Sequence, residues 1–272
     1  MLRTSVHQNV RKFSLNSAGV KCNRLEGKIA IVTASTDGIG FAIARRLAQE
    51  GAKVMISSRR ESNVNRAVEQ LKSEGLLACG TICHVGKKED RERLFHKTKE
   101  EFGGLDILVS NAASNPSAST IFDTSEEVWD KIFDVNVKSS FLLMKESLPL
   151  LRQSKSPSMI IISSIAGYTP ITLLGAYAIS KTALLGLNQV AAATLASEGI
   201  RVNCIAPGII KTKFSQLIVE GETGEATLST IPMQKFGEPS SIASVAAFLA
   251  SDDASYITGE TIVAAGGMQS RL

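Results

Sequence analysis

The stretch KIAIVTASTDGIGFAIARRLA, residues 28–48, joins a short apolar run to an amphipathic run through a turn that contains two glycines. Residues 28–33 have the length and β-branched content of a buried strand, and the residues after the turn have helical spacing. Such a turn presents backbone N–H groups and the positive end of a helix dipole to a diphosphate. Gly38 and Gly40 lack the Cβ atoms that would block a close approach. The spacing is not the G-x-G-x-x-G fingerprint, and a helix-capping turn with Asp37 as N-cap is the alternative.

The same alternation of short apolar and longer amphipathic runs continues along the chain. Strands are expected at 28–33, 52–57, 76–83, 105–110, 159–164, 200–206 and 261–265, with helices between them, the longest over 126–151. Near-continuous apolar strands between helices indicate a parallel sheet buried on both faces. Because no linker divides the body, we expect one α/β domain over residues 25–267, followed by a tail at 268–272. Its expected architecture is a Rossmann-type, doubly wound, seven-stranded parallel sheet with helices on both faces.

The composition argues against several classes of protein. Of 272 residues, 44% are hydrophobic and 21% charged, which suffices for a substantial core. Residues 1–24 hold five basic residues and no acidic one, so the remainder has 25 basic and 26 acidic residues and indicates no nucleic-acid-binding body. No run of 18 apolar residues occurs, so we expect no membrane span. The four cysteines and three histidines show no metal-ligand spacing, and we expect no metal.

Both ends of the chain are similar to targeting signals. Residues 1–24 are rich in Arg, Ser and Asn, as is typical of a transit peptide for the mitochondrial matrix. The alternatives for this segment are a solvated tail and, less well supported, a basic arm for nucleic acid. Ser270-Arg271-Leu272 is a variant of the S-K-L peroxisomal signal. The two signals conflict, so the sequence leaves both compartments open.

The end of the second expected strand indicates which dinucleotide is bound. An NAD-selective site has an acidic residue here to accept from the ribose 2′-hydroxyl, whereas a 2′-phosphate requires arginine. The sequence is Ser57-Ser58-Arg59-Arg60, with no acid before Glu61. A hydroxyl and guanidinium groups can bind a phosphate through charge-assisted hydrogen bonds, which favours NADP(H). Two ordinary surface arginines are the alternative.

Lys181 is the only charged residue in the stretch 156–197. Tyr177 lies four residues earlier and therefore on the same face of a helix. An ammonium in apolar surroundings favours a nearby phenolate and should lower the pKa of the tyrosine, which makes an acid/base pair plausible. The alternative is a core tyrosine beside a lysine that extends from a buried helix to water.

Taken together, the motifs along residues 25–267 resemble the short-chain dehydrogenase/reductase family. The resemblance rests on the glycine turn 33–40, Asn111-Ala112-Ala113, Asn136 in FDVNVKSS, Ser163-Ser164, Tyr177-x-x-x-Lys181 and Pro207-Gly208. Longer stretches such as SKTALLGL and IRVNCIAPGIIKT resemble its NADP-dependent carbonyl reductases of peroxisomes and mitochondria, which reduce dicarbonyls, aromatic ketones, retinal and some 3-ketosteroids.

The resemblance implies roles for individual residues. Tyr177 would protonate a carbonyl oxygen, and Lys181 would lower the tyrosine's pKa and hold the nicotinamide ribose. Ser164 would polarise the carbonyl, and Asn136 would hold a water that returns protons to Lys181. The residues implied to bind the cofactor, NADPH or NADP⁺, are Thr33, Ser35, Thr36, Gly38, Ile39, Gly40, Ser58, Arg59, Arg60, His84, Val85, Asn111, Ala112, Tyr177, Lys181, Pro207, Gly208, Ile210 and Thr212.

The chain departs from the family pattern at a few positions. The usual Thr-Gly opening is Thr33-Ala34, and the usual Asn-Ala-Gly is Asn111-Ala112-Ala113. His84-Val85 stands where Asp-Val is common beside the adenine. NADP-dependent members sometimes carry a basic residue at the position of Asp37, so NADP selectivity here depends on Arg59 and Arg60.

The substrate is expected to be a small, apolar or aromatic carbonyl compound. Residues 165–176 and an irregular lid over 209–232 would form the walls, with no charge before Lys211. Substrate contacts are expected from Ser164, Ile165, Leu174, Tyr177 and Phe214, and the walls also offer Tyr168 and Leu173. The preferred reaction is NADPH-dependent reduction of ketones, α-dicarbonyls or retinal to alcohols.

Two other functions remain open at the level of sequence. The chain could be an NAD(P)-dependent alcohol or hydroxysteroid dehydrogenase that works in the oxidative direction. It could also be a non-catalytic dinucleotide-binding scaffold, against which the complete set of four catalytic residues argues. The uncharged helix around 182–197 is expected to pack against a second copy of the chain in a homodimer or homotetramer.

Overall fold

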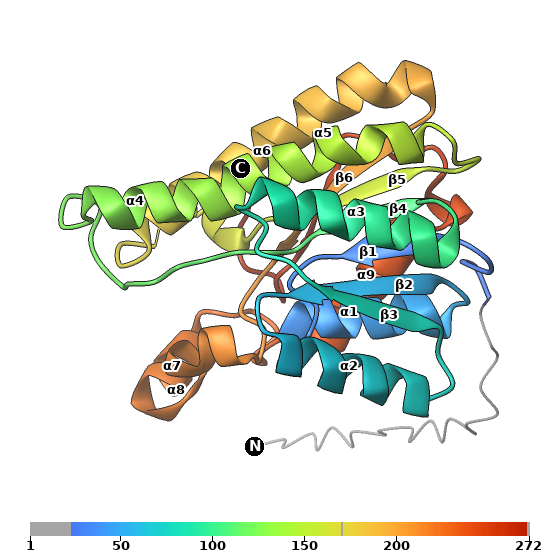
Figure 1. Cartoon of the computed structure of the whole chain (residues 1–272). Coiled ribbons are helices and arrows are strands. Elements are labelled where there is room, and N and C mark those ends of the chain that lie inside the picture. Colours follow the sequence, from blue (N-terminus) through green and yellow to red (C-terminus); the bar gives the residue numbers. More distant parts are fainter. Residues whose placement is uncertain (1–22, 170, 271–272) are drawn as a thin grey trace, which may run out of the picture.

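Seven parallel strands form the sheet at the centre of the protein (Figure 1). The computed structural model describes residues 23–169 and 171–270. Within these residues the strands are β1 (Ile29–Val32), β2 (Lys53–Ser58), β3 (Ala78–Ile82), β4 (Ile107–Ser110), β5 (Ser158–Ile162), β6 (Arg201–Pro207) and β7 (Thr261–Ala264). Their spatial order is β3-β2-β1-β4-β5-β6-β7, and all neighbours are parallel. The expected seven-stranded parallel sheet is confirmed.

The direction in which the sheet grows reverses between β1 and β4. From β1 the chain builds outward through β2 and β3, and from β4 it builds outward on the other side to β7. The connections that leave the carboxyl ends of β1 and β4 therefore diverge, and such a point in a doubly wound sheet forms a crevice suited to ligands. Val32 pairs with Val109 there, so the glycine turn and the segment after β4 start side by side.

Helices cover both faces of the sheet, as expected (Figure 1). On one face α1 (Gly38–Gln49), α2 (Glu61–Ser73) and α9 (Pro239–Ala250) share one apolar cluster with the strands. On the other, α3 (Lys88–Phe102), α5 (Ser139–Leu151) and α6 (Gly175–Leu195) share a second cluster. Every residue of β4 and β5 is buried, which explains their continuous apolar character.

The long helix expected over 126–151 is interrupted. A π-helical stretch, Asp134–Lys138, separates α4 (Glu126–Phe133) from α5. Asn136 lies in this stretch, is fully buried, and forms hydrogen bonds with the backbone of Ser114 and the hydroxyl of Ser180. A π-turn adds a residue to a helix and is common at functional sites. Because the partners come from remote segments, helical periodicity could not reveal the interruption.

The segment 209–232 contains short helices, so the expectation of an irregular loop is wrong. A 3₁₀ turn (Lys213–Ser215) is followed by α7 (Gln216–Val219) and α8 (Gly221–Ser229), which stand out from the body in Figure 1. Thr212 and Ser215 form a capping box that starts the first turn. These helices are too short to produce a periodic signal. We keep the name lid for residues 209–232.

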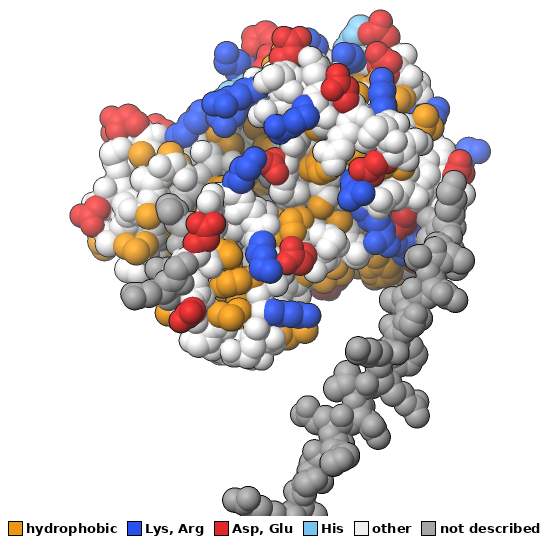
Figure 2. All heavy atoms as spheres, turned by 90° about the horizontal axis from the view of Figure 1, so that it is seen from below, with side chains coloured by type: hydrophobic (Ala, Val, Ile, Leu, Met, Phe, Trp, Pro, Cys, Tyr) orange, Lys and Arg blue, Asp and Glu red, His pale blue; other side chains and the backbone are white. Residues whose placement is uncertain are grey.

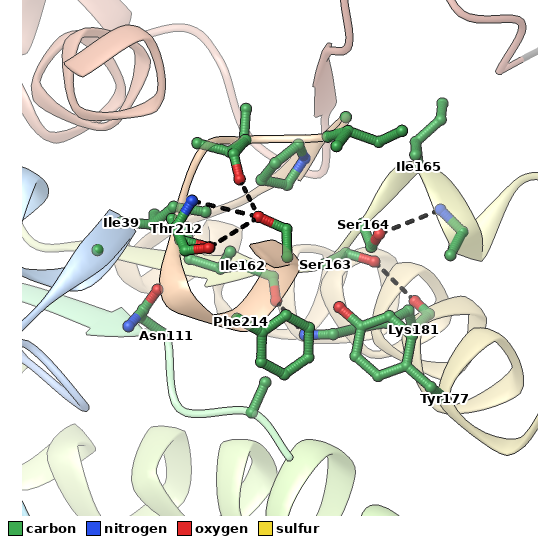
Figure 3. A pocket seen from close by; sticks show the side chains of 18 of the residues that line it. Ile39, Asn111, Ile162, Ser163, Ser164, Ile165, Tyr177, Lys181, Thr212 and Phe214 are labelled. Atoms are coloured by element: carbon green, nitrogen blue, oxygen red, sulfur yellow. Dashed lines mark hydrogen bonds between the residues drawn. The ribbon is translucent and has the colours of Figure 1, made fainter. Parts of the chain in front are cut away.

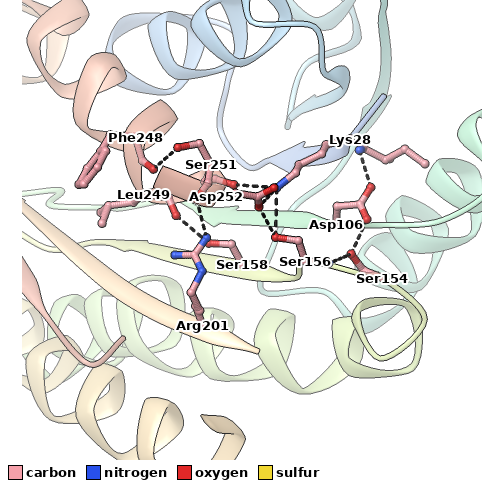
Figure 4. A network of polar contacts seen from close by, with 12 residues as sticks. Lys28, Asp106, Ser154, Ser156, Ser158, Arg201, Phe248, Leu249, Ser251 and Asp252 are labelled. Carbon is pink, nitrogen blue, oxygen red and sulfur yellow. Dashed lines mark hydrogen bonds and ion pairs between the residues drawn. The ribbon is translucent and has the colours of Figure 1, made fainter. Parts of the chain in front are cut away.

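Polar contacts join the amino ends of the strands, at the edge opposite the crevice (Figure 4). Lys28, directly before β1, donates to the Asp252 carboxylate at 2.8 Å, and Ser156 donates to the same oxygen. Arg201, the first residue of β6, donates to the carbonyl of Ser251. Ser251 and Asp252 directly follow α9, so this network ties that helix to three strands.

The predicted targeting signals fall largely outside the described residues. These signals are the basic segment, of which residues 1–22 lie outside, and the C-terminal tripeptide, of which Arg271 and Leu272 lie outside. Arg24, the last residue of the basic segment, donates to the carboxylate of Glu50 at 2.8 Å and is thereby joined to the folded body. The compartment stays a prediction.

In the part of the chain that the structure describes, no helix has both the length and the apolar character needed to cross a bilayer. That part also contains no group of three or more His, Cys, Asp or Glu side chains placed to hold a metal ion. On the face seen from below, acidic and basic side chains are interspersed (Figure 2). Ile179 and Val190 of α6 are 43% and 68% exposed, which is compatible with a subunit contact, and the oligomeric state stays a prediction.

Candidate active site

A cavity of about 290 Å³ lies at the carboxyl ends of the strands (Figure 3). Its walls come from the glycine turn, the ends of β4, β5 and β6, the start of α6 and the lid. The structure brings together there many of the residues expected from the sequence: Gly38, Ile39, Gly40, Asn111, Ser164, Ile165, Leu174, Tyr177, Lys181, Pro207, Gly208, Ile210, Thr212 and Phe214. Segments more than 170 residues apart in the chain thus share one site.

The glycine turn is both a helix cap and a point of very close packing. The Asp37 carboxylate accepts from the N–H of Gly38 at 2.8 Å and caps α1. A Cβ on Gly40 would lie 2.4 Å from Asn111 Nδ2 and 2.5 Å from the carbonyl oxygen of Ala34, so only glycine fits. Ala34 has a φ of 50°, a left-handed conformation that costs an alanine about 1 kcal/mol. The helix-capping interpretation of this turn is therefore confirmed, and its role in binding a diphosphate stays a prediction.

Replacing Gly40 by alanine is expected to lower the free energy of unfolding by about 2–3 kcal/mol, because the added methyl overlaps backbone that cannot move away. Gly186→Ala is the matched control, since nothing lies within 4 Å of its Cβ and it sits inside α6. That control should gain about 0.5–1 kcal/mol. Urea unfolding measures both, and equal stability of Gly40→Ala and the wild type would contradict the packing described here.

Tyr177 and Lys181 lie one turn apart near the start of α6. Their side chains are buried, with 8% and 2% exposed, and Lys181 Nζ is 5.5 Å from the centroid of the Tyr177 ring. Burial raises the pKa of Tyr177 to about 12, an effect that a hydrogen bond with Ser164 opposes. Burial lowers the pKa of Lys181 to about 8. The expectation that the ammonium lowers the tyrosine's pKa is not met, because desolvation of the phenol dominates.

The Lys181 side chain is held in place from β5. Its Nζ donates to the carbonyl oxygen of Ile162 at 2.8 Å, and its own carbonyl oxygen accepts from the Ser163 hydroxyl at 2.8 Å. The sheet end and α6 are therefore joined on both sides of this residue. The lysine does not extend to water, so the alternative of a snorkelling lysine does not apply.

The Ser164 hydroxyl is positioned to face the tyrosine. Ser164 Oγ accepts from the N–H of Ala166 at 3.1 Å, which leaves its O–H free to donate. Figure 3 shows the Ser164 and Tyr177 side chains pointing into the same space, with the Phe214 ring beside them. The Phe214 and Tyr177 ring centroids are 5.9 Å apart. Two hydroxyl groups thus meet against an aromatic wall.

Asn136 does not line the cavity. Its Oδ1 accepts from the N–H of Ser114 at 2.7 Å, and its Nδ2 donates to Ser114 O and Ser180 Oγ. Its carbonyl oxygen accepts from the Ser140 hydroxyl at 2.8 Å. Ser180 directly precedes Lys181, so Asn136 fixes α6 relative to the loop after β4. Its role in proton return stays a prediction.

Comparison with known proteins agrees with this geometry. A family model described as Enoyl-(Acyl carrier protein) reductase matches residues 33–269. The chain belongs to the short-chain dehydrogenase/reductase family. Dehydrogenase/reductase SDR family member 4 of Bos taurus is 53% identical over 251 residues, 92% of this chain and 90% of the relative. The Homo sapiens protein of the same name is 53% identical over 249 residues, 91% and 90%. Tropinone reductase-like 3 of Erythroxylum coca is 49% identical over 250 residues, 92% and 96%.

As a short-chain dehydrogenase/reductase, the protein is an oxidoreductase that binds a nicotinamide dinucleotide. The residues present fit such a cofactor. The glycine turn brings the backbone at the start of α1 to the cavity, and Gly208 lines it where the chain packs tightly against Ala265. Asn111, Tyr177 and Lys181 supply polar groups between those walls.

Several residues expected to bind the cofactor act on the turn instead of lining the cavity. The Thr33 hydroxyl accepts from the N–H groups of Asn111 and Ala112, and the Ser35 hydroxyl accepts from the N–H of Ser57. Both hydroxyls are buried, so they hold the turn against β2 and β4. Thr36 and Ala112 are half-buried and Val85 is buried, all outside the cavity.

A second group lies at the carboxyl ends of β2 and β3, also outside the cavity. It comprises Ser58, Arg59, Arg60 and His84. Both arginines are exposed, and neither forms an ion pair or a side-chain hydrogen bond with a described residue. Burial together with Lys131 and Arg59 lowers the pKa of His84. This edge of the crevice therefore presents unpaired positive charge.

Other residues of this dehydrogenase/reductase line the cavity although the sequence did not single them out. Ile171 and Ile218, which lie in the two segments expected to form the walls, add to the apolar wall, whereas Tyr168 and Leu173 do not line it. Asp37 and Lys213 form an ion pair at its rim. Lys213 directly follows Thr212, which was expected at the site. No sequence pattern indicates that Lys213 pairs with Asp37, 176 residues earlier.

Proposed function

We propose that the protein reduces apolar or aromatic ketones, α-dicarbonyls or retinal to alcohols with NADPH. The observation that carries this proposal is the meeting of the Ser164 and Tyr177 hydroxyls against a wall of Ile165, Leu174 and Phe214. Two adjacent hydroxyls suit one carbonyl oxygen, and the apolar wall suits an uncharged substituent. The names of the relatives, which include a reductase, support oxidoreduction between carbonyl and alcohol in general.

The residues of the chain would divide the chemistry as follows. The bound cofactor supplies the hydride. Tyr177, kept protonated by its raised pKa, donates its proton to the carbonyl oxygen as charge develops there. Ser164 donates a hydrogen bond to the same oxygen and polarises the carbonyl. Lys181, with a pKa near 8, is largely protonated at neutral pH and stabilises the phenolate that remains. The Ile162 carbonyl oxygen accepts a hydrogen bond from Lys181 Nζ and so keeps the ammonium on the side of Tyr177.

The preference for NADPH is supported by the unpaired charge of Arg59 and Arg60. A guanidinium without an intramolecular carboxylate is available to a phosphate. We expect Arg59→Leu to raise the Kd for NADPH about tenfold and to change the Kd for NADH less than twofold. Arg152→Leu, which removes an exposed arginine paired with Glu198, is the control and should change neither. Equal weakening of both cofactors by Arg59→Leu would contradict the assignment.

Turnover of an aromatic α-dicarbonyl tests the reaction itself. The loss of reduced-cofactor absorbance would be followed with NADPH and with NADH, and the reverse reaction with an aromatic alcohol and the oxidised cofactors. Reduction with NADPH at a kcat/KM well above that of the other three reactions is expected. Turnover confined to NAD⁺ and the alcohol would overturn the proposal in favour of an oxidative dehydrogenase. Cofactor binding without any turnover would favour the scaffold.

A further inference from the structure

The rim of the cavity carries an ion pair between the glycine turn and the lid. Lys213 Nζ donates to Asp37 Oδ2 at 2.6 Å. Both residues line the cavity, and the Asp37 carboxylate also caps α1 through the N–H of Gly38. A carboxylate therefore occupies the start of the helix that faces the cofactor's diphosphate, where a second anion would be repelled. Lys213 offsets this charge through the ion pair, and Arg66 adds to its effect.

The base of the lid is fixed closely enough to aim Lys213. Thr212 and Ser215 form a capping box around it, and Ser215 Oγ also donates to the carbonyl oxygen of Ile210. A Cβ on Gly38 would lie 3.3 Å from Thr212 Cγ2, so the Thr212 side chain at the base of the lid packs directly against the first turn of α1. The backbone of Lys213 is consequently held beside the turn, from where its ammonium reaches Asp37.

The ion pair itself is weak enough to be exchanged. The Lys213 and Asp37 side chains are 79% and 56% exposed, and solvent-exposed pairs contribute little to stability. A lysine ammonium is a good point-charge ligand for phosphate. A doubly charged diphosphate arriving at α1 therefore competes well with a single carboxylate.

We propose that Lys213 is a phosphate-binding residue supplied by the lid, and that it passes from Asp37 to the cofactor's diphosphate when the dinucleotide binds. The position of the lid and the affinity for the cofactor are then coupled, because the Lys213 ammonium binds either Asp37 or the diphosphate. The inference rests on dinucleotide binding in this cavity, which the proposed function also requires, but not on the preference for NADPH.

Binding of ADP, measured by calorimetry on the full chain, tests the proposal without turnover. We expect Lys213→Met to raise the Kd for ADP about tenfold or more. Asp37→Asn should leave the Kd unchanged or lower, since asparagine caps a helix as well as aspartate and only the charge is lost. In the double variant the loss should be clearly smaller than in Lys213→Met alone, because the repelling carboxylate is gone. Lys211→Met removes another exposed lysine of the lid, one that pairs with Glu238 outside the lid; it is the control, and its Kd for ADP should stay within twofold of wild type.

Hydrogen exchange supplies a second readout. ADP should slow amide exchange over residues 212–219 in the wild type and in Lys211→Met, but not in Lys213→Met. A Kd for ADP within twofold of wild type in Lys213→Met, or equal protection of its lid, would overturn the proposal. Binding of 2′-AMP separates it from the cofactor preference. If 2′-AMP binds no better than adenosine, the proposed preference for NADPH is wrong. The proposal for Lys213 still stands in that case if Lys213→Met weakens the binding of ADP.

Discussion

Replacement of Tyr177 by phenylalanine is expected to lower kcat/KM for carbonyl reduction by about 10³–10⁴-fold, because it removes the hydroxyl that we propose as the proton donor to the carbonyl oxygen. The side chain keeps its shape and its contacts with the Phe214 ring. The Kd for NADPH should therefore change less than threefold. Steady-state kinetics and a fluorescence titration of NADPH measure the two quantities independently.

Tyr168→Phe is the matched control for this result. The same hydroxyl is removed from a nearby tyrosine that does not line the cavity, so activity should stay within twofold of wild type. Ser164→Ala should lie between the two, since it removes one hydrogen bond to the carbonyl oxygen but leaves the proton donor. Residual activity above a tenth of wild type in Tyr177→Phe would mean that another group or water protonates the product.

Replacement of Lys181 by methionine should abolish activity and yet stabilise the fold. Burial lowers the pKa of this lysine from 10.5 to about 8, which corresponds to about 3 kcal/mol of unfavourable desolvation at neutral pH. Methionine fills similar space without charge, but the Ile162 carbonyl loses its hydrogen bond, which costs about 1 kcal/mol. We expect a net gain of about 1–2 kcal/mol in the free energy of unfolding at pH 7, measured by urea denaturation.

The pH dependence identifies the origin of that gain. Because the pKa of Lys181 is lower in the folded protein, the unfolded chain binds more protons between about pH 8 and 10.5. The stability of the wild type should therefore rise with pH across this window relative to Lys181→Met, and the wild type should become the more stable of the two near its upper end, where the desolvation cost is gone and the hydrogen bond to Ile162 remains. Lys145→Met, at an exposed position of α5, should run parallel to wild type. A less stable Lys181→Met at pH 7 would show that the contacts of the ammonium outweigh its desolvation.

Most of the fold follows from local sequence. Apolar strands bounded by glycines and helices with clear spacing predict the seven strands within a few residues, and burial of β4 and β5 on both faces explains why. The interruption at Asn136 does not follow, since its hydrogen-bond partners Ser114 and Ser180 are 22 and 44 residues away. The lid helices α7 and α8 could not be predicted either, because they are too short to show helical periodicity.

The site was predictable where its residues belong to one helix or one turn. Tyr177 and Lys181 are four residues apart, and their isolation in an uncharged helix marks them. The direction of the tyrosine's pKa was not predictable, because it depends on how much of the side chain is desolvated in the folded protein. The pair of Asp37 and Lys213 depends on tertiary approach and has no local signature.

Three of the apolar residues that line the cavity do not belong to the two large clusters that hold the sheet and helices together. Ile171, Phe214 and Ile218 line the cavity but are members of neither cluster. Substitutions there can change which molecule is accepted with little loss of folding free energy, whereas the reacting groups stand on the sheet and on α6. Related proteins can therefore differ in substrate through changes in residues 165–176 and in the lid, while the sheet and the helices around it stay the same.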